Sequence, residues 1–246
     1  MTTLARSCQR VKMPPVRYVF AMVVGALLPA CDWMPGKPTQ ATAWHSPHSV
    51  VDFEKLYMEN CRGCHGTQTE PSGAIALDNP LYIAVIPRET LRSIIVNGVP
   101  GTAMVAFSEE HGGPLTEKQI DIIVDGITAW GAKNPPSGPL PAYSGPLGDI
   151  AQGKAAFATF CASCHGADGN GGDKAGSVVK PAYLGLVSDQ YLRSIVIAGR
   201  NDLGCPDFQS RVPGKPMSEA EISGVVAWLA SQRKNEFGQP LPLTQR

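Results

Sequence analysis

The sequence predicts an all-α fold made of two similar helical units in tandem. Apolar side chains recur at helical spacing along each unit, and no run shows the strict alternation of a half-exposed strand. The segment Leu91–Gly98 also resembles Leu192–Gly199 residue by residue, which indicates an internal repeat. With 246 residues, the chain is long enough for two small domains.

Residues 1–30 have the pattern of a signal peptide. Basic residues and no acidic residue precede an apolar run over residues 18–30, which is short for a transmembrane helix but suits a signal-peptide core. The run ends at Cys31 in a sequence that resembles a bacterial lipoprotein signal, in which this cysteine is lipidated. Asp32 would then favour the periplasmic side of the cytoplasmic membrane. The alternatives are plain secretion, which gives a soluble periplasmic protein, and an uncleaved anchor.

Composition divides the rest of the chain. Residues 31–49 are rich in proline, glycine and hydroxyl side chains and predict an extended tether. Residues 133–148 hold five prolines, and because proline cannot continue a helix they predict a semi-rigid linker. A first domain at residues 50–132, a second at 149–233 and a C-terminal tail at 234–246 remain. The formal net charge is +0 at pH 7, but without residues 1–30 the chain keeps 17 basic and 21 acidic side chains, and this acidic balance argues against binding to nucleic acid.

Each domain is expected to contain three helices in the same order. The first runs into a cysteine motif, and the second lies in the middle of the domain. The third opens with a capping box, in which a hydroxyl and a side chain three residues later satisfy free backbone N–H groups. The expected helices are 51–60, 88–97 and one that begins at Thr116-x-x-Gln119, followed by 150–160, 189–198 and one that begins at Ser218-x-x-Glu221.

Two pentapeptides share the pattern C-x-x-C-H, which is the attachment site of a c-type haem. Two thiols at this spacing add to the two vinyl groups of one porphyrin, and the adjacent histidine reaches the iron. A lone C-x-x-C would also fit a redox disulfide or half of a zinc site, but the repeated histidine favours two covalently attached haem c groups. The motif residues are Cys61, Cys64 and His65 in the first domain, and Cys161, Cys164 and His165 in the second.

Each domain resembles a class I cytochrome c domain, over about residues 50–132 and 149–233. The resemblance rests on an N-terminal helix, the C-x-x-C-H motif, a loop rich in glycine and proline, and a C-terminal helix with an aromatic residue. It implies that the first and last helices of each domain cross and pack together. It also implies that a proline carbonyl accepts a hydrogen bond from each proximal histidine, and Pro80 and Pro181 stand at corresponding places.

Met104 is the candidate distal iron ligand of the first domain, because it lies in a loop after the middle helix that resembles the methionine loop of the family. A thioether ligand favours Fe(II) and raises the reduction potential. Two alternatives remain: Met104 fills space in the core, as methionine often does, or His111 is the ligand.

The second domain departs from this pattern. Cys205 stands where the repeat places Met104, and it has no disulfide partner once the other cysteines bind haem, leave with the signal or carry lipid. Cys205 is therefore the first candidate for the distal ligand. Met217 and an open or water-filled site are the alternatives, although Met217 aligns with an apolar packing position. Arg200 and Arg211 would stabilise a thiolate or an anionic substrate, or they are simply solvated.

The resemblance and the absence of a recognisable acid–base constellation favour an electron carrier over a stand-alone enzyme. Its expected partners are a quinol-oxidising complex, a terminal oxidase or reaction centre, other cytochromes, and the membrane through a lipid anchor. Cytochromes with a histidine and a cysteine on one iron also occur in dihaem oxidoreductases of sulfur compounds. A thiosulfate dehydrogenase-like enzyme is therefore the alternative, with the Cys205 haem as its active site.

Overall fold

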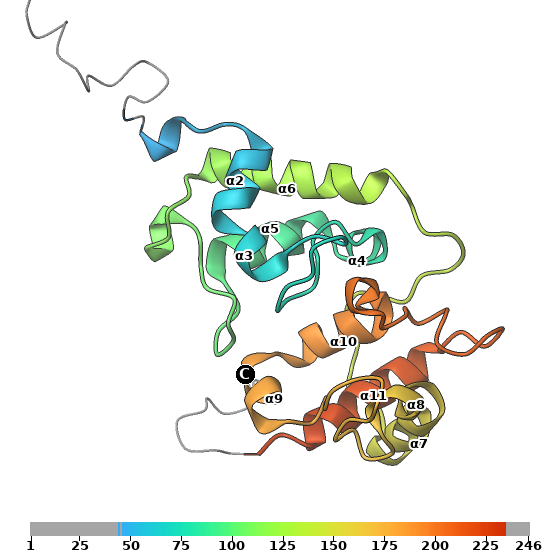
Figure 1. Ribbon diagram of the computed structural model, residues 1–246. Coiled ribbons are helices and arrows are strands. Elements are labelled where there is room, and N and C mark those ends of the chain that lie inside the picture. Colours follow the sequence, from blue (N-terminus) through green and yellow to red (C-terminus); the bar gives the residue numbers. More distant parts are fainter. Residues whose placement is uncertain (1–43, 45, 235–246) are drawn as a thin grey trace, which may run out of the picture. The chain divides into compact units, whose positions relative to one another are not determined.

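The computed structural model describes residue 44 and residues 46–234 (Figure 1). The chain divides into two units between Ser46 and Pro47, and nearly all of the described residues belong to the second unit. The predicted signal peptide, Cys31 and the tail beyond Lys234 lie outside the described residues. No helix within the described part of the chain is long and apolar enough to span a bilayer.

The described residues are helical and contain isolated bridges but no strand, which confirms the predicted all-α class. We call residues 47–132 the first half and residues 149–234 the second half. The first half contains η2 (Pro47–Ser49), α2 (Phe53–Asn60), α3 (Arg62–His65), α4 (Pro80–Val85), α5 (Arg88–Asn97), η3 (Glu109–His111) and α6 (Glu117–Ala132). The second half contains α7 (Ile150–Phe160), α8 (Ala162–His165), α9 (Pro181–Leu186), α10 (Asp189–Ala198), η4 (Asn201–Leu203) and α11 (Glu219–Ser231).

Local sequence signals account for most of these helix ends. Helices α5, α7 and α10 have the expected bounds, and both predicted capping boxes are formed at the starts of α6 and α11. Helix α2 begins at Phe53 because the Asp52 side chain accepts a hydrogen bond from the Lys55 amide and caps the helix there. The short helices α4 and α9 were not expected from the sequence. Each begins with a proline, which suits the first helical position because its missing N–H is not needed there.

The first and last helices of each half pack together, as the cytochrome c resemblance implies. In the first half, Trp130 on α6 meets Phe53 and Tyr57 on α2 edge to face, with ring centroids 4.6 and 4.8 Å apart. In the second half, Trp228 on α11 and Phe157 on α7 have centroids 4.3 Å apart. Figure 1 shows α11 lying against α7. These aromatic contacts form a small core in each half. The cysteine motif begins next to this core.

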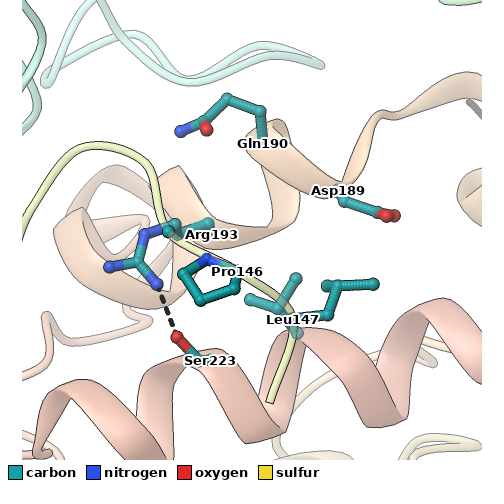
Figure 2. A pocket seen from close by; sticks show the side chains of 8 residues that line it. Pro146, Leu147, Asp189, Gln190, Arg193 and Ser223 are labelled. Atoms are coloured by element: carbon teal, nitrogen blue, oxygen red, sulfur yellow. Dashed lines mark hydrogen bonds between the residues drawn. The ribbon is translucent and has the colours of Figure 1, made fainter. Parts of the chain in front are cut away.

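The proline-rich linker is fixed to the second half by a buried arginine. Arg193 on α10 donates hydrogen bonds to the Ala142 carbonyl at 2.9 Å and the Tyr143 carbonyl at 3.2 Å. It also donates to the Ser223 hydroxyl on α11 at 3.0 Å, as Figure 2 shows. These bonds satisfy Arg193 beside a pocket of about 310 Å³, which includes none of the predicted haem residues. The pocket is lined by Gly145, Pro146, Leu147, Asp189, Gln190, Arg193, Ser223 and Val226.

Candidate haem sites

Each C-x-x-C-H motif forms one helical turn directly after the first helix of its half. The Cys61 amide donates to the Tyr57 carbonyl at 2.8 Å and the His65 amide donates to the Cys61 carbonyl at 3.0 Å. The second motif repeats this pattern, with Cys161 bonded to the Phe157 carbonyl at 2.8 Å and His165 to the Cys161 carbonyl at 3.0 Å. The turn places each histidine directly after the second cysteine of its motif. The two halves therefore present the same arrangement of two thiols and one imidazole.

The motif cysteines have free thiols, and the first thiol of each motif is held in its neutral form. Burial and the neighbouring Cys64 raise the pKa of Cys61 to about 12. Burial also raises the pKa of Cys161 to about 11. A redox-active C-x-x-C pair instead needs a cysteine whose pKa is lowered. This electrostatic environment argues against the redox-disulfide interpretation of the motif.

The Nδ1 atom of each proximal histidine is held by a backbone carbonyl, although not by the carbonyl that we expected. His65 Nδ1 lies 2.8 Å from the Ile75 carbonyl oxygen, and His165 Nδ1 lies 2.8 Å from that of Gly176. Pro80 and Pro181 are therefore not the acceptors. Each of these prolines occupies the first turn of α4 or α9, where a carbonyl faces the N–H groups of its own helix. With Nδ1 fixed in this way, Nε2 is the ring nitrogen that would be left to bind an iron.

The loops that carry Met104 and Cys205 are built in the same way. The middle helix of each half ends at a glycine with positive φ, at +66° for Gly98 and +69° for Gly199. A Cβ at Gly98 would lie 2.7 Å from the Met104 carbonyl oxygen, and a Cβ at Gly199 would lie 2.6 Å from that of Cys205. Only glycine lets the loop return so close to the end of the helix. The backbone geometry therefore makes Met104 and Cys205 equivalent positions.

Met217 occupies a packing position, as its alignment with Leu115 suggests. The Met217 amide donates to the Phe208 carbonyl at 2.9 Å, and the Leu115 amide makes the matching bond to the Phe107 carbonyl at 2.9 Å. Both side chains are 3% exposed and belong to the buried core. Met217 thus fills the place that leucine fills in the first half.

Cys205 lies beside the ring of His165. Its interaction with the ring is the main reason that the pKa of His165 is raised. Burial of Cys205 opposes ionisation, but the interaction with His165 and the positive charge of Arg211 together lower the pKa of its thiol below the usual value. Arg211 is held close by its hydrogen bond to the Pro206 carbonyl at 3.2 Å. The second half therefore places a sulfur that is disposed to ionise beside the imidazole of His165.

The remaining polar candidates lie elsewhere. His111 is exposed, and its Nε2 lies 2.8 Å from the Asn97 side-chain oxygen at the surface. Arg200 is 8% exposed and is paired with Asp202, so it is not solvated. It also lies away from the Cys205 thiol, because its Nη2 donates to the Ser72 carbonyl at 2.6 Å. Met104 is half-buried and packs against the core of the first half.

The family described as cytochrome c oxidase, cbb3-type, subunit III matches residues 49–127 and again residues 148–229. The chain belongs to this family. A curated relative, the cbb3-type cytochrome c oxidase subunit CcoP of Azospirillum sp. (strain B510), is 28% identical over 139 residues. The match covers 52% of this chain and 43% of that relative, so the chain spans less than half of the relative's length. A chain of the Kuenenia stuttgartiensis reducing HAO-like protein complex Kustc0457/Kustc0458 matches 78% of this chain and 100% of its own, with a TM-score of 0.43 and 18% identity.

Membership of this family makes the protein a cytochrome c, a class that carries covalently bound haem c and transfers electrons. The side chains present fit such a group, because each half offers two free thiols and a histidine with its Nδ1 already bonded. The sequence did not indicate Ile75 and Gly176 as acceptors of the histidine bonds, because they act through backbone carbonyls, which every residue has. It also missed the contacts of Arg200, which depend on how the two halves meet.

Proposed function

We propose that this protein is a dihaem c-type cytochrome that delivers electrons one at a time to a terminal oxidase. We further propose that it is held at the periplasmic side of the cytoplasmic membrane by a lipid on Cys31. The observation that carries the proposal is the duplicated site: two C-x-x-C-H turns of the same construction, each with its histidine bonded to a backbone carbonyl. The relative named as an oxidase subunit favours a terminal oxidase as the acceptor over a reaction centre. A quinol-oxidising complex or another cytochrome would be the donor.

Haem c, when bound, supplies an iron that takes up and releases one electron between Fe(III) and Fe(II). Cys61 and Cys64 would hold one haem through thioether bonds, and His65 and Met104 would bind its iron. The second haem would be held by the equivalent residues of the second half, namely Cys161, Cys164, His165 and Cys205. The carbonyls of Ile75 and Gly176 would orient the two imidazoles by accepting their Nδ1 hydrogens.

The two proposed sulfur ligands would differ in charge, which would separate the two reduction potentials. Met104 offers a neutral thioether, and a neutral soft ligand favours Fe(II). The Cys205 thiol has a lowered pKa because His165 and Arg211 outweigh its burial, so it would bind as a thiolate and favour Fe(III). We therefore assign the higher potential to the first half. With this order of potentials, the residues of the second half would hold the haem that gives up its electron more readily, and those of the first half would hold the haem that accepts it.

The alternative is a sulfur-compound oxidoreductase of the thiosulfate dehydrogenase type, and the position of Cys205 beside His165 favours it. Such an enzyme also needs cationic side chains that are free to bind an anionic substrate. Arg200 is committed to Asp202 and to the first half, and Arg211 donates to the carbonyls of Pro206 and Ile195. With both guanidinium groups occupied, the carrier is the better-supported function.

Mass spectrometry of the protein purified from the membrane fraction tests the haem count, and two covalent haems are expected. Electron paramagnetic resonance then tests the ligands. Cys205→Met is expected to convert the second low-spin signal to one like that of the first half, whereas Met217→Leu, the matched control, is expected to leave both signals unchanged. A single haem would defeat the dihaem proposal, and a second signal unaltered by Cys205→Met would defeat the ligand assignment. Thiosulfate-dependent reduction of an acceptor dye would favour the enzyme.

A further inference from the structure

Arg200 is a buried residue of the second half that is anchored to the proposed distal ligand. Its amide donates to the Cys205 carbonyl at 2.8 Å, and the Cys205 amide donates back to the Arg200 carbonyl at 2.9 Å. Asp202 orients the side chain, with Oδ1 accepting from Nε at 2.9 Å and Oδ2 accepting from Nη2 at 2.7 Å. The Asp202 side chain is 1% exposed, so this is a buried ion pair. A guanidinium held by two hydrogen bonds to one carboxylate has a fixed orientation.

The free edge of this guanidinium lies against the first half. Nη2 donates to the Ser72 carbonyl at 2.6 Å and Nη1 donates to the Gly73 carbonyl at 3.4 Å. The same loop continues to Ile75, whose carbonyl oxygen lies 2.8 Å from His65 Nδ1. Arg200 therefore holds the short segment that fixes the proximal imidazole of the other half.

We propose that Arg200, held by Asp202, is a positioning residue for the haem site of the first half, supplied by the second half. This inference rests on the proposed dihaem function. Arg200 would act in two ways: it fixes the loop that orients His65, and it places a positive charge near the first iron. A nearby cation favours the less positive Fe(II) state and so raises the reduction potential.

The positive charges near the two histidines agree with this division. Arg200 is the cation that acts on His65, whereas Arg211 is the cation that acts on His165. The arginine that acts on His65 therefore belongs to the other half.

The test is a spectroelectrochemical titration of the full-length protein with both haems attached. Arg200→Gln is expected to make reduction of the first haem at least tenfold less favourable, which is 59 mV for one electron, and to leave the second haem unchanged. Arg211→Gln is the matched control, for which the larger shift is expected at the second haem. The double variant Arg200→Gln/Asp202→Asn leaves no unpaired buried charge, and it is expected to shift the first haem in the same direction by less.

If the Arg200→Gln protein does not accumulate, the reduction potential of the first haem in the double variant tests the proposal. The proposal is overturned if Arg200→Gln and the double variant, each carrying two haems, show the wild-type potential at the first haem, or if Arg200→Gln shifts both haems equally. Mass spectrometry of the wild type separates this outcome from failure of the proposed function. A wild type with one haem refutes the dihaem cytochrome itself, whereas unmoved potentials in two-haem variants refute only the role of Arg200.

Discussion

Replacing Gly199 with alanine should distort the proposed second haem site without replacing a proposed ligand. Gly199 has φ +69° and ψ −173°, a backbone conformation that is open essentially only to glycine. A Cβ there would also lie 2.6 Å from the Cys205 carbonyl oxygen and 2.7 Å from the Asp207 amide nitrogen. Both neighbours are backbone atoms, so the loop has to move, and Cys205 moves with it.

Gly204 supplies a matched control in the same loop. It also has positive φ, at +78°, but with ψ 12° it lies in the left-handed helical region, and a Cβ there would meet nothing within 4 Å. The left-handed conformation costs a non-glycine residue about 1 kcal/mol. The conformation of Gly199 costs about 3 kcal/mol before any clash is counted. The difference of about 2 kcal/mol corresponds to a melting temperature about 4–8 °C lower for Gly199→Ala than for Gly204→Ala in a protein of this size.

Thermal unfolding followed by far-ultraviolet circular dichroism measures this difference, and the low-spin spectrum of the second haem reports the position of Cys205. Gly199→Ala is expected to lose or change that spectrum, whereas Gly204→Ala is expected to keep it. Equal melting temperatures together with an intact second-haem spectrum in Gly199→Ala would refute the reasoning. Gly98→Ala repeats the test in the first half, where the Met104 signal should change instead.

Three further changes test other parts of the structure. Arg193→Leu should lower the free energy of unfolding by about 2 kcal/mol and speed proteolysis of the linker, because the Ala142 and Tyr143 carbonyls lose their donor. Arg88→Leu, which removes an exposed pair with Asp125, should change neither the free energy of unfolding nor the rate of proteolysis. Asn79→Ala should lower the free energy of unfolding by about 2 kcal/mol in a denaturant titration, because this buried side chain caps α4 and donates to the Ala198 carbonyl; exposed Asn97→Ala should have little effect. Cys31→Ser should abolish incorporation of labelled palmitate and release the protein from membranes; retained label would contradict the lipid anchor.

Local signals in the sequence predicted the helices well, because caps and periodicity are properties of neighbouring residues. The bounds of α5, α7 and α10 followed from such signals alone. The equivalence of Met104 and Cys205 also followed from the repeat, and the glycines that precede the two loops give it a geometric basis. The acceptors of the histidine bonds could not be predicted, because any carbonyl in the loop after the motif is chemically suitable. Ile75 and Gly176 are selected by the path of the folded loop.

The contact between the halves breaks the symmetry of the repeat. Val99 is the counterpart of Arg200, since its amide donates to the Met104 carbonyl at 2.8 Å just as the Arg200 amide donates to that of Cys205. Valine has no donor that could reach another loop. The carbonyls that receive Arg200 belong to Ser72 and Gly73 of the first half, so the donor side chain and the acceptor loop come from different copies of one unit. The two proposed haem sites would therefore differ in two ways, through the sulfur ligand within each half and through a charge that only the first site receives from its neighbour. Both differences would act in the same direction and favour Fe(II) in the first half.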